Sequence, residues 1–181
     1  MWKDFIPVAF HVDYWDNLGW PDRFAAKAWT ERQRTYAAAW NTTTVYTPEF
    51  ILDGREWRGR EIPLASVDRP GVLKVSLSAD GAATASFKSE TAGARSFDVY
   101  LAALGFSLNS DVRAGENRGR KLQHDFVVLS LVKELMTARN AEIRAPIDAL
   151  KQKQNEVGAV AVWITEAGRT DPIQAVGGWL R

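Results

Sequence analysis

Two histidines and a short acidic, aromatic segment carry the most versatile chemistry in the sequence. His11 and Asp13 stand two positions apart at the end of an apolar run, and Asp16 follows closely. Residues two apart on a strand share one face, and imidazole and carboxylate groups are suitable ligands for zinc or iron. His124 is more than a hundred positions further along the chain. We therefore expect His11 to hydrogen-bond to Asp16 or to a loop carbonyl, with metal binding through His11 as the alternative.

Aromatic side chains are concentrated near the start of the chain. Six of the eight tryptophans occur within the first 57 residues, and Trp15 and Trp20 belong to an acidic loop that also holds Tyr14. Such groups anchor sugar rings or peptide prolines at interfaces, but they also pack in small cores. We expect Trp29 and Trp40 to pack in the core, whereas packing and ligand contact both stay open for Trp15 and Trp20.

A glycine-bounded loop at residues 115–120 could meet an anion. Its two glycines surround Glu116, Asn117 and Arg118, and Arg120 follows. Backbone N–H groups in such a loop can form an anion-binding nest, and arginine forks suit carboxylate or phosphate. The alternative is a strand connection whose charges pair with one another or brace neighbouring parts of the protein.

The composition of the chain argues against several classes of function. The chain has 181 residues, 23 basic and 22 acidic side chains, and a formal net charge of +1. This balance gives no reason to expect nucleic acid as a partner, and no apolar run approaches the ~20 residues of a membrane span. Without cysteine, the sequence offers no disulfide, cysteine-ligated metal site or thiol nucleophile. We assign no catalytic residue, no metal site and no cofactor, so the chain as it stands favours a binding protein over an enzyme.

The first third of the chain is predicted to mix strand and helix. An apolar run over residues 6–12 is typical of a buried strand, and the periodicity over 21–40 predicts a helix. Asp53-Gly54 predicts a tight hairpin turn, because both turn positions need positive φ. Arg32 lies inside the apolar stripe of the helix, where its stem covers apolar surface or its guanidinium points toward an acidic group or ligand.

The remainder of the chain is predicted to form antiparallel strands. Residues 61–71, which contain two prolines and a glycine, separate a portion at 1–65 from one at 72–181. After this linker, short alternating apolar runs with turn residues between them favour a β-sandwich. The predicted strands lie near residues 73–77, 83–87, 97–101, 105–110, 121–134, 139–145, 158–165 and 173–180, with one short helix near 146–150.

Three segments together resemble a known family: His11–Trp20, Val45–Phe50 with the Asp53-Gly54 turn, and Gly115–Arg120 with His124. They are similar to the secreted bacterial family called domain of unknown function 1223, whose members join a thioredoxin-like domain to a β-sandwich-like domain. The resemblance implies an α+β fold. It places a partial thioredoxin-like α/β domain at 1–65 and an antiparallel β-sandwich-like domain at 72–181.

One departure from the family governs the expected function. Family members carry an upstream Cys-x-x-Cys pair together with a first strand and helix, and this sequence has none of the three. The resemblance implies that Tyr46, Thr47 and Pro48 line the site facing that pair, with Pro48 in a cis peptide bond. We hypothesise that the chain lacks a natural N-terminal segment and is redox-inactive in this form. It carries no signal peptide, although the resemblance implies a periplasmic or secreted protein.

The expected function is binding of a protein partner or a small molecule near His11–Trp20 and Thr47-Pro48. One alternative is a thiol–disulfide oxidoreductase whose cysteines lie upstream of Met1, and the other is a metal-binding protein that uses His11. An incomplete sheet edge would also invite self-pairing into a homodimer.

Overall fold

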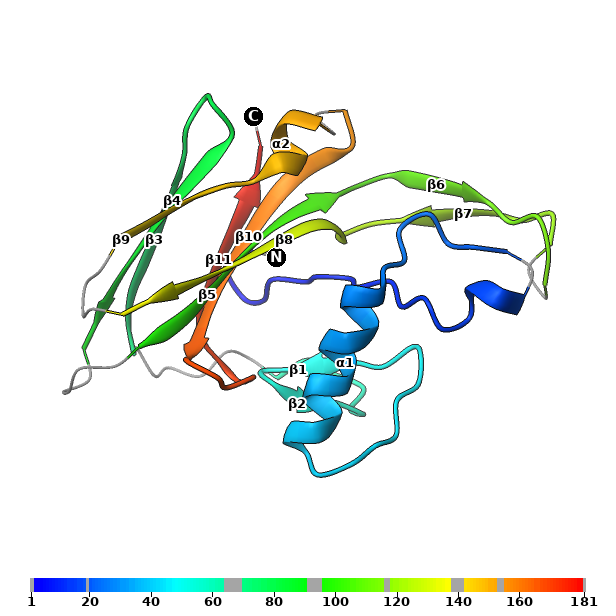
Figure 1. Ribbon diagram of the computed structural model, residues 1–181, viewed down its shortest axis with the longest axis horizontal. Helices are drawn as coiled ribbons and strands as arrows, with labels where there is room; N and C mark the ends of the chain where they lie inside the picture. Colours follow the sequence, from blue (N-terminus) through cyan, green and yellow to red (C-terminus); the bar gives the residue numbers. More distant parts are fainter. Residues whose placement is uncertain are drawn as a thin grey trace.

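A four-stranded antiparallel sheet forms the centre of the protein (Figure 1). The computed structural model describes residues 2–18, 20–63, 70–90, 96–115, 118–137, 142–152 and 155–180. The strand order is β11-β10-β5-β8, with β5 at Phe97–Gly105, β8 at Val127–Met136, β10 at Val157–Glu166 and β11 at Pro172–Trp179. The inner strands β5 and β10 are buried along nearly their whole length, because layers cover both faces of the sheet.

A second antiparallel sheet covers one face. It has the order β3-β4-β9, with β3 at Gly71–Leu77, β4 at Ala82–Ser89 and β9 at Glu142–Pro146. Alternate residues of the central strands, such as Leu101 and Val162, pack against Phe87 in one continuous core. The short helix α2 (Asp148–Gln152) follows β9 and adds Ala149 to this core. The sandwich-like packing predicted from alternating apolar residues is confirmed.

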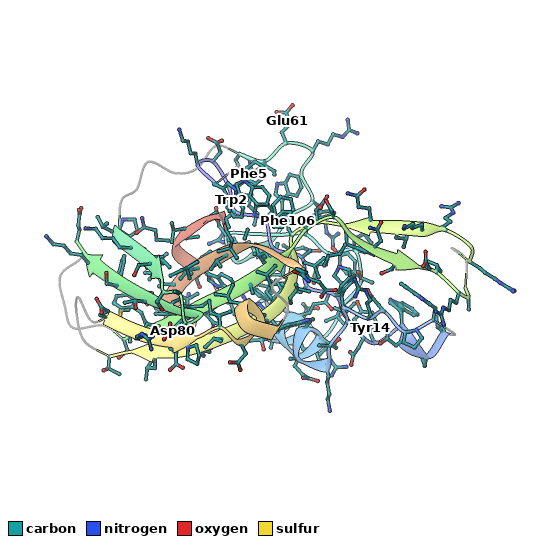
Figure 2. The ribbon with its side chains drawn as sticks, turned by 90° about the horizontal axis from the view of Figure 1, so that it is seen from above. Trp2, Phe5, Tyr14, Glu61, Asp80 and Phe106 are labelled. Carbon is teal, nitrogen blue, oxygen red and sulfur yellow. The ribbon has the colours of Figure 1, made fainter. Side chains whose placement is uncertain are left out.

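An irregular layer covers the other face of the central sheet. The sheet presents small residues here, including Ala102, Ala159 and Ala161. Bulky side chains pack against them from the N-terminal segment and from helix α1 (Lys27–Ala39), namely Trp2, Ile6, Val8, Phe10 and Trp29. Alanine on the sheet leaves room for large rings above it, which keeps the interior closely packed. Trp2 and Phe106, both labelled in Figure 2, contact the ring of Phe126 at one end of this layer.

A small hairpin next to α1 is held at its tip. Strands β1 (Ile51–Leu52) and β2 (Arg55–Glu56) join through Asp53 and Gly54, both at positive φ, as the sequence predicts. A Cβ at Gly54 would lie 2.5 Å from Cα of Asp171 in the β10–β11 loop, so only glycine fits there. Trp40, at the end of α1, donates from Nε1 to the Gly54 carbonyl over 2.9 Å.

A longer hairpin projects from the sheet at the far end of the molecule (Figure 1). Its strands are β6 (Leu108–Asp111) and β7 (Lys121–His124), and the glycine-bounded loop connects them. Glu116 and Asn117, two of the predicted site residues in this loop, lie outside the described residues.

The expected α+β fold with a partial thioredoxin-like domain is wrong. The protein is mostly β: its described residues form four antiparallel sheets and two α-helices, without a thioredoxin-like α/β arrangement. Residues 6–12 run extended, but only Ala9 pairs with the sheet, through a parallel bridge to Val127. The division at 1–65 and 72–181 stays a prediction. No helix in the described part of the chain is long and apolar enough to cross a bilayer.

Helix α1 also begins later than predicted. The pattern places its start at Pro21 with Asp22 in the first turn, whereas the helix starts at Lys27. Asp22 is engaged elsewhere, since its carboxylate accepts hydrogen bonds from His11 and from the Phe24 backbone N–H. These contacts hold residues 22–24 in a turn and delay the helix.

Candidate functional site

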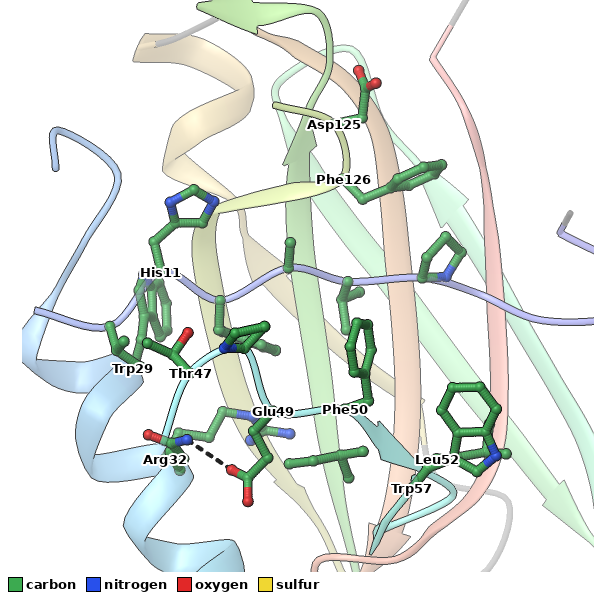
Figure 3. Close-up of a pocket in the computed structure, with 18 of the residues that line it drawn as sticks. His11, Trp29, Arg32, Thr47, Glu49, Phe50, Leu52, Trp57, Asp125 and Phe126 are labelled. Atoms are coloured by element: carbon green, nitrogen blue, oxygen red, sulfur yellow. Dashed lines mark hydrogen bonds between the residues drawn. The ribbon is translucent and has the colours of Figure 1, made fainter. Parts of the chain in front are cut away.

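A groove of about 1050 Å³ lies between the N-terminal segment at residues 2–12, helix α1 and the β1–β2 hairpin (Figure 3). We call it the aromatic groove. Phe50 is 61% exposed in it and meets the ring of Trp57 edge-on. Further large apolar side chains are both exposed and part of the lining: Phe5, Trp15, Leu18, Ile51 and Ile62. Because water contacts so much apolar surface here, this region is the candidate site for a ligand or partner.

Thr47 and Pro48 line the aromatic groove, and the peptide bond between them is cis, as the resemblance implies. Gln33 of α1 positions this loop, although no sequence motif points to it. Its side chain is only 8% exposed, and Nε2 donates to the Tyr46 carbonyl over 2.6 Å and to Oε2 of Glu49 over 2.7 Å. The loop is therefore fastened to the helix from behind.

Tyr46 itself lies outside the groove lining. Its hydroxyl donates to the Glu56 carboxylate, and this hydrogen bond raises the pKa of Tyr46. Of the three residues that the resemblance places at the site, the structure brings Thr47 and Pro48 to the groove and turns Tyr46 toward the hairpin surface.

Arg32 occupies an aromatic cage beneath the groove. Its guanidinium carbon lies 5.0 to 5.3 Å from the ring centres of four residues: Phe10, Tyr36, Tyr100 and Trp163. One guanidinium nitrogen donates to the Tyr36 hydroxyl over 3.0 Å, and Nε is buried. Neither sequence interpretation of Arg32 describes this arrangement. The cation is stabilised by π faces, which join α1 to the sheet at β5 and β10.

The two histidines meet, although they are far apart in the sequence. Nδ1 of His11 lies 2.5 Å from Oδ2 of Asp22, and the rings of His11 and His124 are 5.2 Å apart. Nε2 of His124 lies 3.1 Å from the Ser110 hydroxyl. The expected partner Asp16 is wrong, because Asp16 instead accepts the backbone N–H of Asp22 over 3.1 Å. The histidines fasten the loop before α1 to the β6–β7 hairpin.

Two pKa values respond to this cluster. Burial lowers the pKa of His124, and the nearby charge of His11 lowers it further. Burial of Asp22 acts to raise its pKa, but hydrogen bonds from His11 and the Phe24 N–H outweigh burial and leave the pKa lowered. The cluster therefore favours an ionised Asp22 beside an uncharged His124.

Metal binding has no support in this cluster. Within the described ranges, no group of three or more His, Cys, Asp or Glu side chains is arranged to hold a metal ion. Asp13, the proposed companion of His11, faces α1 instead: its Oδ1 accepts from the Thr30 hydroxyl over 2.5 Å, and its N–H donates back over 3.1 Å. Ser110, which contacts His124, is only 4% exposed.

The remaining predicted residues divide into two groups. Trp15, Asp16 and Trp20 line the aromatic groove, whereas Tyr14 does not. Arg118 and Arg120 are exposed in the connection between β6 and β7 and also lie outside the lining. The structure thus gathers the acidic, aromatic loop and Thr47-Pro48 at one site, and leaves both arginines apart from it.

The apolar residues that line the groove at β1 were missed in the sequence. Phe50, Ile51 and Leu52 are three consecutive apolar residues in a short hairpin. A strand puts successive side chains on opposite faces, so a surface hairpin cannot bury all three. This run was the available signal for an apolar surface near Pro48.

The fold and site define a β-rich protein with a sandwich-like core and an open apolar groove. The chain belongs to the family described as protein of unknown function (DUF1223), which matches it over residues 2–165. This match confirms the family resemblance.

The fold is also similar to the crystal structure of a protein from Agrobacterium tumefaciens, at 24% identity and a TM-score of 0.67. The alignment covers 96% of this chain and 78% of that one. A comparison with curated proteins gives no match. The thiol–disulfide alternative rested on a thioredoxin-like fold, and without that fold it has no structural support.

Proposed function

We propose that the protein binds a segment of a partner protein in the aromatic groove. The observation that carries this proposal is the exposed apolar lining, led by Phe50 and Trp15. Contiguous apolar surface of this kind marks interaction sites, because water contact with it is unfavourable. The groove volume of about 1050 Å³ also lies at the upper limit of small-molecule pockets, which span roughly 300–1,000 Å³. A polypeptide segment fills such a space better than a compact small molecule.

The charge of the groove favours a basic partner. Among the described residues that line it, the carboxylates are Asp4, Asp16, Asp22, Glu49, Asp53 and Asp125. Two basic side chains oppose them, and one of these, Arg32, faces aromatic rings. Complementary charge steers partners toward such a surface and disfavours acidic ones.

Selection from displayed random peptides tests the proposal. The unmodified protein should enrich peptides that combine apolar and basic residues. Phe50→Glu should abolish this enrichment, because it places a charge at an apolar groove residue that is 61% exposed. Val72→Glu is the matched control: Val72 is also exposed but lies on β3, outside the groove. Equal enrichment by the Phe50→Glu variant would show that the groove is not the binding site.

A further inference from the structure

We infer that the aromatic groove takes its partner as an extended, basic β-strand that pairs with the backbone of both groove walls. This inference rests on the proposed function and adds the conformation and chemistry of the partner. The evidence for it is the arrangement of backbone N–H and C=O groups in the two walls, rather than the apolar lining.

The first wall is the N-terminal segment. Ala9 uses both of its backbone groups on the central sheet: its N–H donates to the Phe126 carbonyl over 2.8 Å, and its carbonyl accepts from Val128 over 2.9 Å. In an extended chain, adjacent residues direct their N–H and C=O groups to opposite sides. Val8 and Phe10 therefore direct theirs toward the groove, and within the described part of the chain these groups have no backbone partner.

The second wall is strand β1. Leu52 pairs with Arg55, and the Phe50 carbonyl accepts the Trp57 N–H over 2.8 Å. Ile51 lies between these hydrogen-bonded positions, so its own N–H and C=O point away from β2. Figure 3 shows this outer edge of β1 facing the N-terminal segment, with Phe50 standing between the two walls. Among the described residues, two edges without a backbone partner thus flank one groove.

Both walls are held by other elements, and the structure shows no pairing between the described residues of one wall and those of the other. Trp40 and the close approach of Asp171 hold the tip of the hairpin, and Gln33 holds the loop that enters β1. The Ala9 bridge holds the opposite wall against β8. An extended peptide between them would satisfy backbone groups on both sides, which is the mode of recognition by strand addition.

Charge selects the sequence of the strand. Glu49 adjoins β1 and Asp53 follows it, so the two carboxylates flank this wall, and both residues line the groove. Lysine or arginine residues at the ends of the inserted strand would face these carboxylates. An acidic strand would meet repulsion instead.

Synthetic peptides test the inference on the complete chain. The probe is a capped peptide of about eight residues, long enough to span the groove at ~3.3 Å per residue, with alternating valine and threonine and a lysine at each end. Two control peptides carry N-methyl groups on alternate amides, one on the odd and one on the even positions. Each control blocks the hydrogen bonds to one wall, so both should bind about tenfold or more weakly than the probe. Replacing the terminal lysines with glutamates should also weaken binding.

The outcomes separate this inference from the proposed function. If only one methylation pattern weakens binding, or neither does, the two-walled strand is wrong even though the groove binds peptides. If the lysine probe does not bind but peptides from the display selection do, the two-walled strand is also wrong, although the groove binds peptides. If no peptide binds and sedimentation shows a dimer through this face, a second copy of the chain occupies the groove and both proposals fail. If both N-methylation patterns weaken binding, and the unmodified probe binds tightly to a monomer, the result supports a strand paired with both walls.

Discussion

The two faces of the central sheet are covered by layers of different kinds. On one face, strands β3, β4 and β9 close over a core whose members, such as Phe87 and Leu101, are almost fully buried. On the other, the covering side chains of Trp2, Val8 and Phe10 are only partly buried. The first layer is held by backbone ladders, and the second by the bridge at Ala9 and by side-chain contacts such as those of Arg32. The first face is therefore closed, whereas the second stays partly open to solvent.

The largest effect is expected in the core between the two sheets. Phe87→Ala should lower the free energy of unfolding by about 3–5 kcal/mol, because it removes a fully buried ring and leaves a cavity. Urea denaturation measures this change. A loss below about 1 kcal/mol would show that the two faces do not differ in packing as described.

Arg32 should give an intermediate effect, because it joins the second layer to the sheet. Arg32→Gln removes the cation from its four rings and should cost about 1–2 kcal/mol of unfolding free energy. Arg34→Gln is the control on the same helix, since Arg34 is exposed and pairs with Glu31; it should change stability by less than about 0.5 kcal/mol. Equal effects of the two substitutions in urea denaturation would contradict a structural role for the cage.

Acidification should weaken the second layer through His124. Its pKa lies below the usual value of about 6.5, so the unfolded chain takes up this proton before the folded protein does. The contribution of His124 to stability is therefore present above pH 6.5 and declines as the pH falls below it. His11, Asp22, Arg23 and Asp125 are the charged or titratable groups that act on it.

Asp22 should cause a second decline in stability at lower pH. Its lowered pKa means that its contribution is present above about pH 3.8 and is lost as the pH falls further. Unfolding curves between about pH 7 and 5 cover the decline expected from His124, and His124→Gln should flatten them over this range. A variant with an unchanged slope would exclude His124 as the sensitive group.

The smallest effect on stability is expected in the groove itself. Phe50→Ala should change the free energy of unfolding by less than about 0.5 kcal/mol, because most of its ring already contacts water. The same substitution should weaken binding of the lysine probe peptide in a tryptophan fluorescence titration. A large loss of stability would show that Phe50 belongs to the core instead.

The sandwich-like half of the fold was predictable because its signals are local. Alternation along Val99 and Leu101 identifies one sheet face, and Asp80-Gly81 marks the β3–β4 turn. The first third of the chain was harder to predict, since an apolar run looks the same whether a full ladder or one bridge at Ala9 holds it. The number of strands that pair with such a run, and the direction in which they run, depend on residues far away in the sequence. No local pattern contains this information.

The candidate site was predictable only in part for the same reason. The acidic, aromatic loop was identified from neighbouring residues and Thr47-Pro48 from the family resemblance, and both reach the groove. The meeting of His11 with His124 depends on the path of the β6–β7 hairpin, and the cage of Arg32 combines rings from α1, β5, β10 and the N-terminal segment. Such combinations arise from packing after the elements have formed.

The single bridge at Ala9 gives the N-terminal segment an uneven exchange of its amide hydrogens with solvent. The Ala9 amide is hydrogen-bonded to the sheet and should exchange slowly, while the amides of Val8 and Phe10 should exchange rapidly. Filling of the groove would make all three slow. The rate pattern of three consecutive amides, read by nuclear magnetic resonance in deuterated water, thus reports whether the groove is empty or occupied.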